Sequence, residues 1–144
     1  MIGLAARALS VALLVTAGWT VFQQLVARQV ARFLPGPEAY HEAIRWDPEG
    51  AGYHLSLGLH YLTQLDPEQV ARARPHLERA AELNPFEPRA LQELATLYEL
   101  DGERALAERA QLRAVELQPT NGDLLWRMGN FYLRSGELPK ALPR

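Results

Sequence analysis

Apolar side chains recur at steps of three and four residues along most of this chain, and short turns containing glycine or proline interrupt them. Between residues 88 and 117 this pattern predicts two helices, Pro88–Leu100 and Glu103–Leu117, joined by a turn at Asp101-Gly102. The predicted core stripe of the pair contains Leu91, Leu94, Ala95, Tyr98, Leu106, Ala107, Ala110, Ala114 and Leu117. The pattern therefore favours an all-α structure built from helical hairpins.

The hairpin pattern repeats. Four pairs of residues share a spacing of 34: Pro85/Pro119, Ala95/Gly129, Tyr98/Tyr132 and Gly102/Gly136. A fixed period of this size is typical of stacked helix–turn–helix units. We predict a solenoid with a partial unit at 38–48, units at 51–87 and 88–121, and a truncated unit at 122–144.

The unit at 51–87 is longer than its successor, because Pro48 and Pro85 are 37 residues apart. We place the three extra residues in its turn, within the segment TQLDPEQ, and expect Asp66 to cap the next helix. Before this unit, the segment Glu38–Trp46 fits only the second helix of a unit.

The unit Pro88–Asn121 resembles the tetratricopeptide repeat (TPR). The residues that match the family pattern are Leu91, Leu94, Ala95, Tyr98, Gly102, Ala107, Ala114 and Pro119. The unit departs from the pattern at Gln111, where the family has a bulky aromatic residue. The resemblance extends over about residues 38–142 and implies that the first helix of each unit lines a concave, protein-binding face.

Helical phase predicts which side chains this concave face exposes. They run from apolar through acidic to aromatic and basic: Leu55, Leu59, Leu62, Gln92, Glu93, Thr96, Glu99, Trp126, Arg127, Asn130 and Arg134. Tryptophan and arginine are frequent at interface hot spots, so Trp126 and Arg127 are the first candidates for partner contacts. The alternative is that Trp126 packs against a missing cap helix, and the uncapped last unit is itself a second candidate surface.

The resemblance also suggests what the face does not bind. Some TPR proteins clamp a terminal carboxylate with lysine and asparagine side chains, but the matching positions hold Leu55, Leu59, Glu93 and Asp123, and only Arg127 agrees. An acidic C-terminal peptide is therefore not the expected ligand.

The N-terminal part of the chain has a different pattern. Residues 8–27 carry no charge, and a helix needs about 20 residues to cross a bilayer. We predict a single transmembrane helix followed by an amphipathic collar within residues 1–34, ended by Pro35-Gly36-Pro37. A cleaved secretory signal and a buried amphipathic helix are the alternatives.

Composition limits the chemistry. After residue 34 the chain has 12 basic and 17 acidic residues, which argues against nucleic-acid binding. The chain lacks cysteine, and neither its four histidines nor the acidic turn at 99–103 has the spacing of a metal site. We find no catalytic constellation and no cofactor motif, so we expect a binding protein and not an enzyme.

These observations predict an adaptor or scaffold in the bacterial inner membrane, which recruits a protein partner for an envelope assembly. The charges flanking the apolar segment do not fix its orientation, and a periplasmic position of the repeats is the working expectation. The alternative is a permanently bound accessory subunit of a large respiratory or photosynthetic membrane complex.

Overall fold

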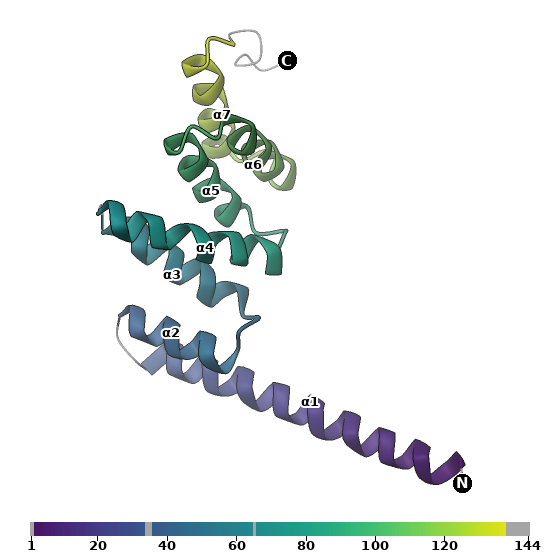
Figure 1. The fold of residues 1–144 in the computed structure, drawn as a ribbon. Helices are drawn as coiled ribbons and strands as arrows, with labels where there is room; N and C mark the ends of the chain where they lie inside the picture. The colour runs from purple at the N-terminus through teal and green to yellow at the C-terminus, as the bar shows by residue number, and fades with distance from the viewer. Residues whose placement is uncertain (1, 34–35, 65, 138–144) are drawn as a thin grey trace.

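The computed structural model describes residues 2–33, 36–64 and 66–137, with residues 2–11 described by their backbone alone. This part of the chain is all-α and contains no strand (Figure 1). Its helices are α1 (Ile2–Phe33), α2 (Pro37–Trp46), α3 (Ala51–Thr63), α4 (Pro67–Leu83), α5 (Pro88–Leu100), α6 (Arg104–Leu117) and α7 (Gly122–Arg134).

The helices form hairpins that stack in chain order. The C-terminal part of α1 pairs with α2, α3 pairs with α4, α5 pairs with α6, and α7 packs on α6. Figure 1 shows the stack rising from the purple end of the chain to the yellow end, with the first part of α1 projecting beyond it. The predicted solenoid of helical hairpins is confirmed within the described residues.

The hairpin α5–α6 follows the sequence prediction closely. Helix α5 has the predicted bounds, α6 begins one residue later than expected, and Gly102 ends the turn with a φ of 76°. The amide of Glu103 donates to the carbonyl of Tyr98 at 2.8 Å. Gly136 repeats this turn with a φ of 73°, because only glycine adopts that conformation without strain.

The predicted long turn between α3 and α4 is wrong. Helices α3 and α5 both have 13 residues, whereas α4 has 17 residues and α6 has 14. The three extra residues therefore lengthen α4 at its start. Asp66 caps the helix as predicted, with its carboxylate accepting from the amide of Glu68 at 3.3 Å, and Pro67 fits the first turn because its missing N–H is not needed there.

Helix α2 is the second helix of a hairpin whose first helix is the end of α1. Ala27 of α1 and both Ala39 and Ala43 of α2 are fully buried, and these small side chains allow the two helices to approach closely. The end of α1 therefore belongs to a hairpin, although its sequence pattern predicted it to be part of the anchor. Helix α1 ends at Phe33, before the predicted stop, and Gly36 has a φ of 79°.

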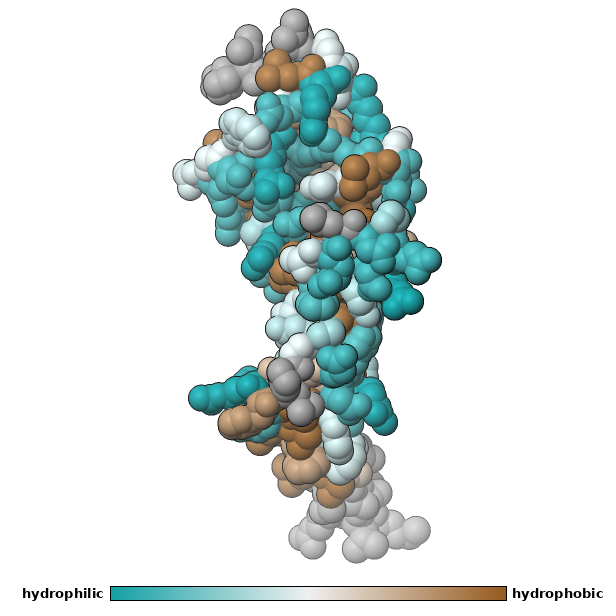
Figure 2. Space-filling view, turned by 90° about the vertical axis from the view of Figure 1, so that its left-hand side faces the viewer, coloured by the Kyte–Doolittle hydropathy of each residue, from teal (hydrophilic) through white to brown (hydrophobic). Residues whose placement is uncertain are grey.

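The earlier part of α1 makes few contacts. Every described side chain from residue 12 to residue 22 is exposed, including the large apolar ones Leu13, Leu14, Val15, Trp19, Val21 and Phe22. Figure 2 shows apolar surface at this end of the molecule. Among the described residues, no helix has both the length and the apolar character that a membrane crossing requires. The predicted span starts at Ala8, and the side chains of residues 8–11 lie outside the described part.

Small residues set the spacing inside the hairpins. A β-carbon added to Gly58 of α3 would lie 2.7 Å from Cγ of Leu77 and 3.3 Å from the carbonyl oxygen of Ala73, both on α4. Leu57 and Leu77 are the largest fully buried side chains, and most other core residues are alanines. The core is therefore thin, and it depends on close contact between helix backbones.

The side chain of Arg74 joins the hairpin α3–α4 to the hairpin α5–α6. Arg74 of α4 contacts Glu78 at 3.0 Å and both Asp101 and Glu103 of the α5–α6 turn at 2.7 Å. Its guanidinium also lies 5.0 Å from the ring centre of Tyr98. The acidic turn thus serves as the partner of an arginine from the neighbouring unit.

Two glycine substitutions in α3 test the role of close helix packing. Gly58→Ala should lower the free energy of unfolding by about 1–3 kcal/mol, because the new methyl group meets a buried leucine and backbone. Gly52→Ala is the matched control, since nothing lies within 4 Å of its added β-carbon, and it should be neutral or stabilising by up to about 1 kcal/mol. Urea unfolding of both variants measures the difference. Equal stabilities would contradict the packing argument.

Candidate functional site

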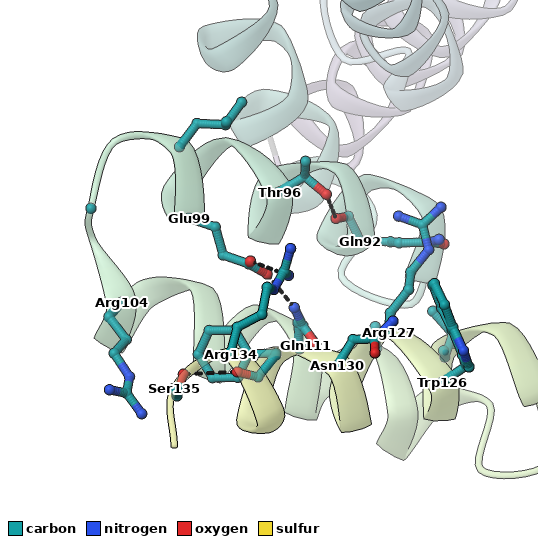
Figure 3. Close-up of a pocket in the computed structure, with 15 residues that line it drawn as sticks. Gln92, Thr96, Glu99, Arg104, Gln111, Trp126, Arg127, Asn130, Arg134 and Ser135 are labelled. Atoms are coloured by element: carbon teal, nitrogen blue, oxygen red, sulfur yellow. Dashed lines mark hydrogen bonds and ion pairs between the residues drawn. The ribbon is translucent and has the colours of Figure 1, made fainter. Parts of the chain in front are cut away.

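A groove of about 660 Å³ opens between α5, α6 and α7 (Figure 3). We call it the α5–α7 groove. Its walls come from three helices and the turn after α5, and it is lined by Gln92, Thr96, Glu99, Leu100, Gly102, Arg104, Gln111, Ala114, Leu124, Trp126, Arg127, Asn130, Phe131, Arg134 and Ser135.

The repeat explains why these side chains converge. Helices α5 and α7 are the first helices of successive units, so the same helical phase faces the groove in both. In α5 this phase places Gln92, Thr96 and Glu99 one turn apart along the wall. In α7 it places Trp126 and Asn130 one turn apart on the opposite wall.

Seven of the predicted concave residues line this groove: Gln92, Thr96, Glu99, Trp126, Arg127, Asn130 and Arg134. Glu93, Leu55, Leu59 and Leu62 are not among its lining residues. Leu55 and Leu62 are partly buried against a core cluster of Ala73, Leu77, Leu94 and Leu97. Two residues of this cluster belong to α5, so the next unit of the stack helps to cover them.

The three arginines of the groove are all paired with carboxylates. Arg127 Nε donates to Asp123 at 3.0 Å, and the same carboxylate oxygen accepts from Gln92 at 2.9 Å. Arg134 pairs with Glu99 at 2.5 Å, and Arg104 pairs with Glu137. The end of the face that was predicted to be aromatic and basic is therefore close to neutral.

Two side chains on the α7 wall are available to a ligand. The Trp126 side chain is 67% exposed although it is large and apolar. Asn130 is half-buried, and its amide makes no side-chain hydrogen bond to another described residue. An exposed indole next to a free amide offers both apolar contact and hydrogen bonding to an extended chain.

Gln111 is the groove residue that sequence reasoning missed as a site residue. Its Nε2 donates to Glu99 Oε1 at 2.7 Å, while its own Oε1 is buried and has no partner among the described residues. A buried unsatisfied acceptor costs about 1–3 kcal/mol. The signal was present in the sequence, because Gln111 replaces the bulky aromatic of the repeat pattern.

The last unit is better covered than the sequence predicts. Phe131 and Tyr132 are buried against Ala107 of α6, and Met128 packs against the same cluster. Leu125 and Leu133 remain about half exposed on α7. The end of the predicted truncated unit, residues 138–144, lies outside the described residues.

Three of the four histidines, His41, His54 and His76, form a cluster where α2, α3 and α4 meet. His54 is buried, its Nε2 lies 3.2 Å from the carbonyl oxygen of Pro48, and its Nδ1 lies 3.3 Å from Nδ1 of His76. His41 approaches Tyr61 at 2.9 Å, and both rings contact His76. The Pro48 carbonyl oxygen can only accept, so Nε2 of His54 is the donor in this contact.

This cluster has the features of a packing site. No group of three or more histidine, cysteine, aspartate or glutamate residues in the described part of the chain is arranged to hold a metal ion. Burial lowers the pKa of His76, and the nearby His54 and His41 lower this pKa further because each disfavours a second positive charge.

Comparison with known proteins identifies the architecture. The chain is similar to a solved structure of MamA, with 26% identity over 73% of this chain and 60% of that one, and a TM-score of 0.64. MamA from Desulfovibrio magneticus RS-1 gives 21% identity over 73% of this chain and 58% of that one, with a TM-score of 0.63. YrrB, a TPR protein with an unusual peptide-binding site, gives 24% identity over 74% of this chain and 53% of that one, with a TM-score of 0.61.

These likenesses support a TPR-like fold for the stacked hairpins, and the chain spans about 53–60% of the length of these three structures. No protein-family model and no curated protein matches the sequence.

The histidine cluster predicts a specific loss of stability in acid. The folded pKa of His76 lies below its usual value of 6.5, so the unfolded chain takes up this proton first as pH falls. The contribution of neutral His76 to the free energy of unfolding is therefore present at pH values well above 6.5, and it is lost progressively as the pH falls below 6.5. Unfolding in urea at about pH 7.5 and about pH 5.5 should show a smaller acid loss for His76→Gln than for the unchanged protein.

The control for this experiment is His60→Gln, which removes a histidine that does not contact His54 or His76 in the described structure. This variant should keep the acid loss of the unchanged protein. If the His76→Gln variant loses as much stability in acid as the unchanged protein does, His76 is not the cause of the acid loss.

Proposed function

We propose that this protein is a scaffold, and not an enzyme, which binds an extended segment of a partner protein in the α5–α7 groove. The observation that carries the proposal is the lining of this groove: an exposed Trp126, and an Asn130 amide without a side-chain hydrogen bond to any described residue, face a polar wall that contains Gln92 and Thr96. The likeness to YrrB, which is itself a peptide-binding TPR protein, supports the same kind of ligand.

The shape and chemistry of the groove favour a peptide over a small substrate. Polar groups are distributed along the walls at the spacing of helical turns, which suits the repeating donors and acceptors of a peptide backbone. Its charged residues are already neutralised in pairs, so the groove presents no concentrated charge for a small ion.

A random peptide library displayed on phage tests this function. Selected peptides should shift the backbone amide resonances of α5 and α7 in nuclear magnetic resonance spectra of the full chain. Trp126→Ala should weaken their binding by about tenfold or more, as expected for a tryptophan hot spot. Phe86→Ala is the control, because Phe86 is an exposed aromatic residue that does not line the groove.

Two outcomes would count against the proposed function. In one, no selected peptide perturbs α5 or α7. In the other, the peptides bind equally well to the Trp126 and Phe86 variants.

We further propose that the apolar part of α1 holds the scaffold at a lipid bilayer, within a bacterial envelope assembly. The support is that residues 12–22 contain no charged side chain and are exposed all round the helix. An apolar surface of this kind is unstable in water and marks contact with lipid or with another protein. Attachment through α1 leaves the groove at the other end of the stack open to a partner (Figure 1).

Flotation with liposomes of phosphatidylethanolamine and phosphatidylglycerol tests membrane attachment. The unchanged full chain should float with the lipid, whereas the double variant Leu14→Glu/Val15→Lys should not, because each buried charge costs about 2.5–3.5 kcal/mol in a bilayer. The matched control Gln24→Glu/Gln29→Lys adds the same charges at exposed polar positions of α1 and should still float. Flotation of both variants, or a failure of the unchanged chain to float, would contradict lipid attachment.

A further inference from the structure

Glu99 of α5 connects the three helices of the α5–α7 groove, because it contacts Gln111 of α6 and Arg134 of α7. Its two carboxylate oxygens accept from different residues, Oε1 from Gln111 Nε2 at 2.7 Å and Oε2 from Arg134 Nη2 at 2.5 Å. Figure 3 shows both donors converging on this carboxylate from α6 and α7. The Glu99 side chain is only 22% exposed, whereas Arg134 is 68% exposed.

The hydrogen bonding around Glu99 leaves one side-chain atom of Gln111, its Oε1, without a donor among the described residues. Because its Nε2 is held by a carboxylate, its amide cannot turn round without placing one oxygen against another. Its Oε1 therefore remains a buried acceptor without a donor among the described residues. The subsite formed by Glu99 and Gln111 thus has one more acceptor than Arg134 satisfies.

We propose that Glu99 and Gln111 form a subsite for a basic side chain of the partner protein, and that Arg134 occupies part of this subsite while the groove is empty. A lysine ammonium has three donors, so it can bond to Glu99 and also to Gln111 Oε1. The partner would then make a hydrogen bond that Arg134 does not make. The inference rests on the proposed function, since it concerns a peptide bound in the same groove.

Arg134 is well suited to be displaced. It belongs to the end of α7, its side chain lies mostly in solvent, and within the described residues its guanidinium makes a polar contact to Glu99 alone. Exposed ion pairs of this kind contribute little to stability, because water solvates the released cation well. Glu99 cannot leave in the same way, since it is held by Gln111 from α6.

The peptides recovered in the selection described above provide the probes. They should contain lysine or arginine, and replacing that residue with uncharged norleucine should weaken binding about tenfold or more. Arg134→Gln should tighten binding of the basic peptide about twofold to fivefold, because the competing ion pair is gone, and should leave the norleucine peptide unaffected.

Gln111→Met tests the orphan acceptor directly. It should weaken the basic peptide about threefold to tenfold, because it removes both the Oε1 acceptor and the Nε2 donor that holds Glu99 in place. Urea unfolding verifies that each variant is folded. Arg113→Gln is the control: Arg113 pairs with Glu116 at 3.0 Å, does not line the groove, and should not change the affinity of either peptide.

The outcomes separate this inference from the function on which it rests. If the peptides shift α5 and α7 but show no preference for a basic residue, or if Arg134→Gln and Gln111→Met leave affinity unchanged, the basic subsite is refuted and the peptide groove stands. If no peptide perturbs the groove, both are refuted.

Discussion

The fold depends on how closely the two helices of each hairpin can approach. At Gly58 there is no room even for a methyl group, because Leu77 and the backbone of Ala73 already lie against it. An alanine takes the equivalent position in the next unit, where Ala95 of α5 is also buried. A core this thin buries few large side chains, so charged contacts at its edge, such as those of Arg74, supplement the apolar packing between units.

The same repetition that builds the core also prepares the groove. Because α5 and α7 have the same phase, side chains that are exposed in one unit face those exposed in the next. The chemistry that is particular to this groove comes from residues that depart from the repeat pattern. Trp126 places a large indole on the wall, and Gln111 places an amide on the floor where an aromatic ring would otherwise fill the space.

Much of the architecture could be predicted, and the exceptions have physical causes. Local signals such as Pro88 and Gly102 fixed the bounds of α5, because these residues begin and end helices through their own backbone preferences. The extra turn of α4 could not be predicted, since residues after a proline can extend either a loop or a helix. Leu55 appeared exposed because its cover comes from the stacking of a neighbouring unit, which helical phase within one unit does not describe. The unsatisfied oxygen of Gln111 required side-chain geometry.

Helix α1 is unbroken from Ile2 to Phe33, so its exposed apolar part and its packed part share one rotational setting. Each residue of an α-helix turns it by about 100° and advances it by about 1.5 Å. Inserting a single residue after Phe22 would therefore rotate the apolar side chains before it by about 100° about the helix axis, relative to α2. A substitution at the same position would leave this orientation unchanged. The orientation of the exposed part of α1 relative to α2 is therefore set by the number of residues between that part and the packed Ala27.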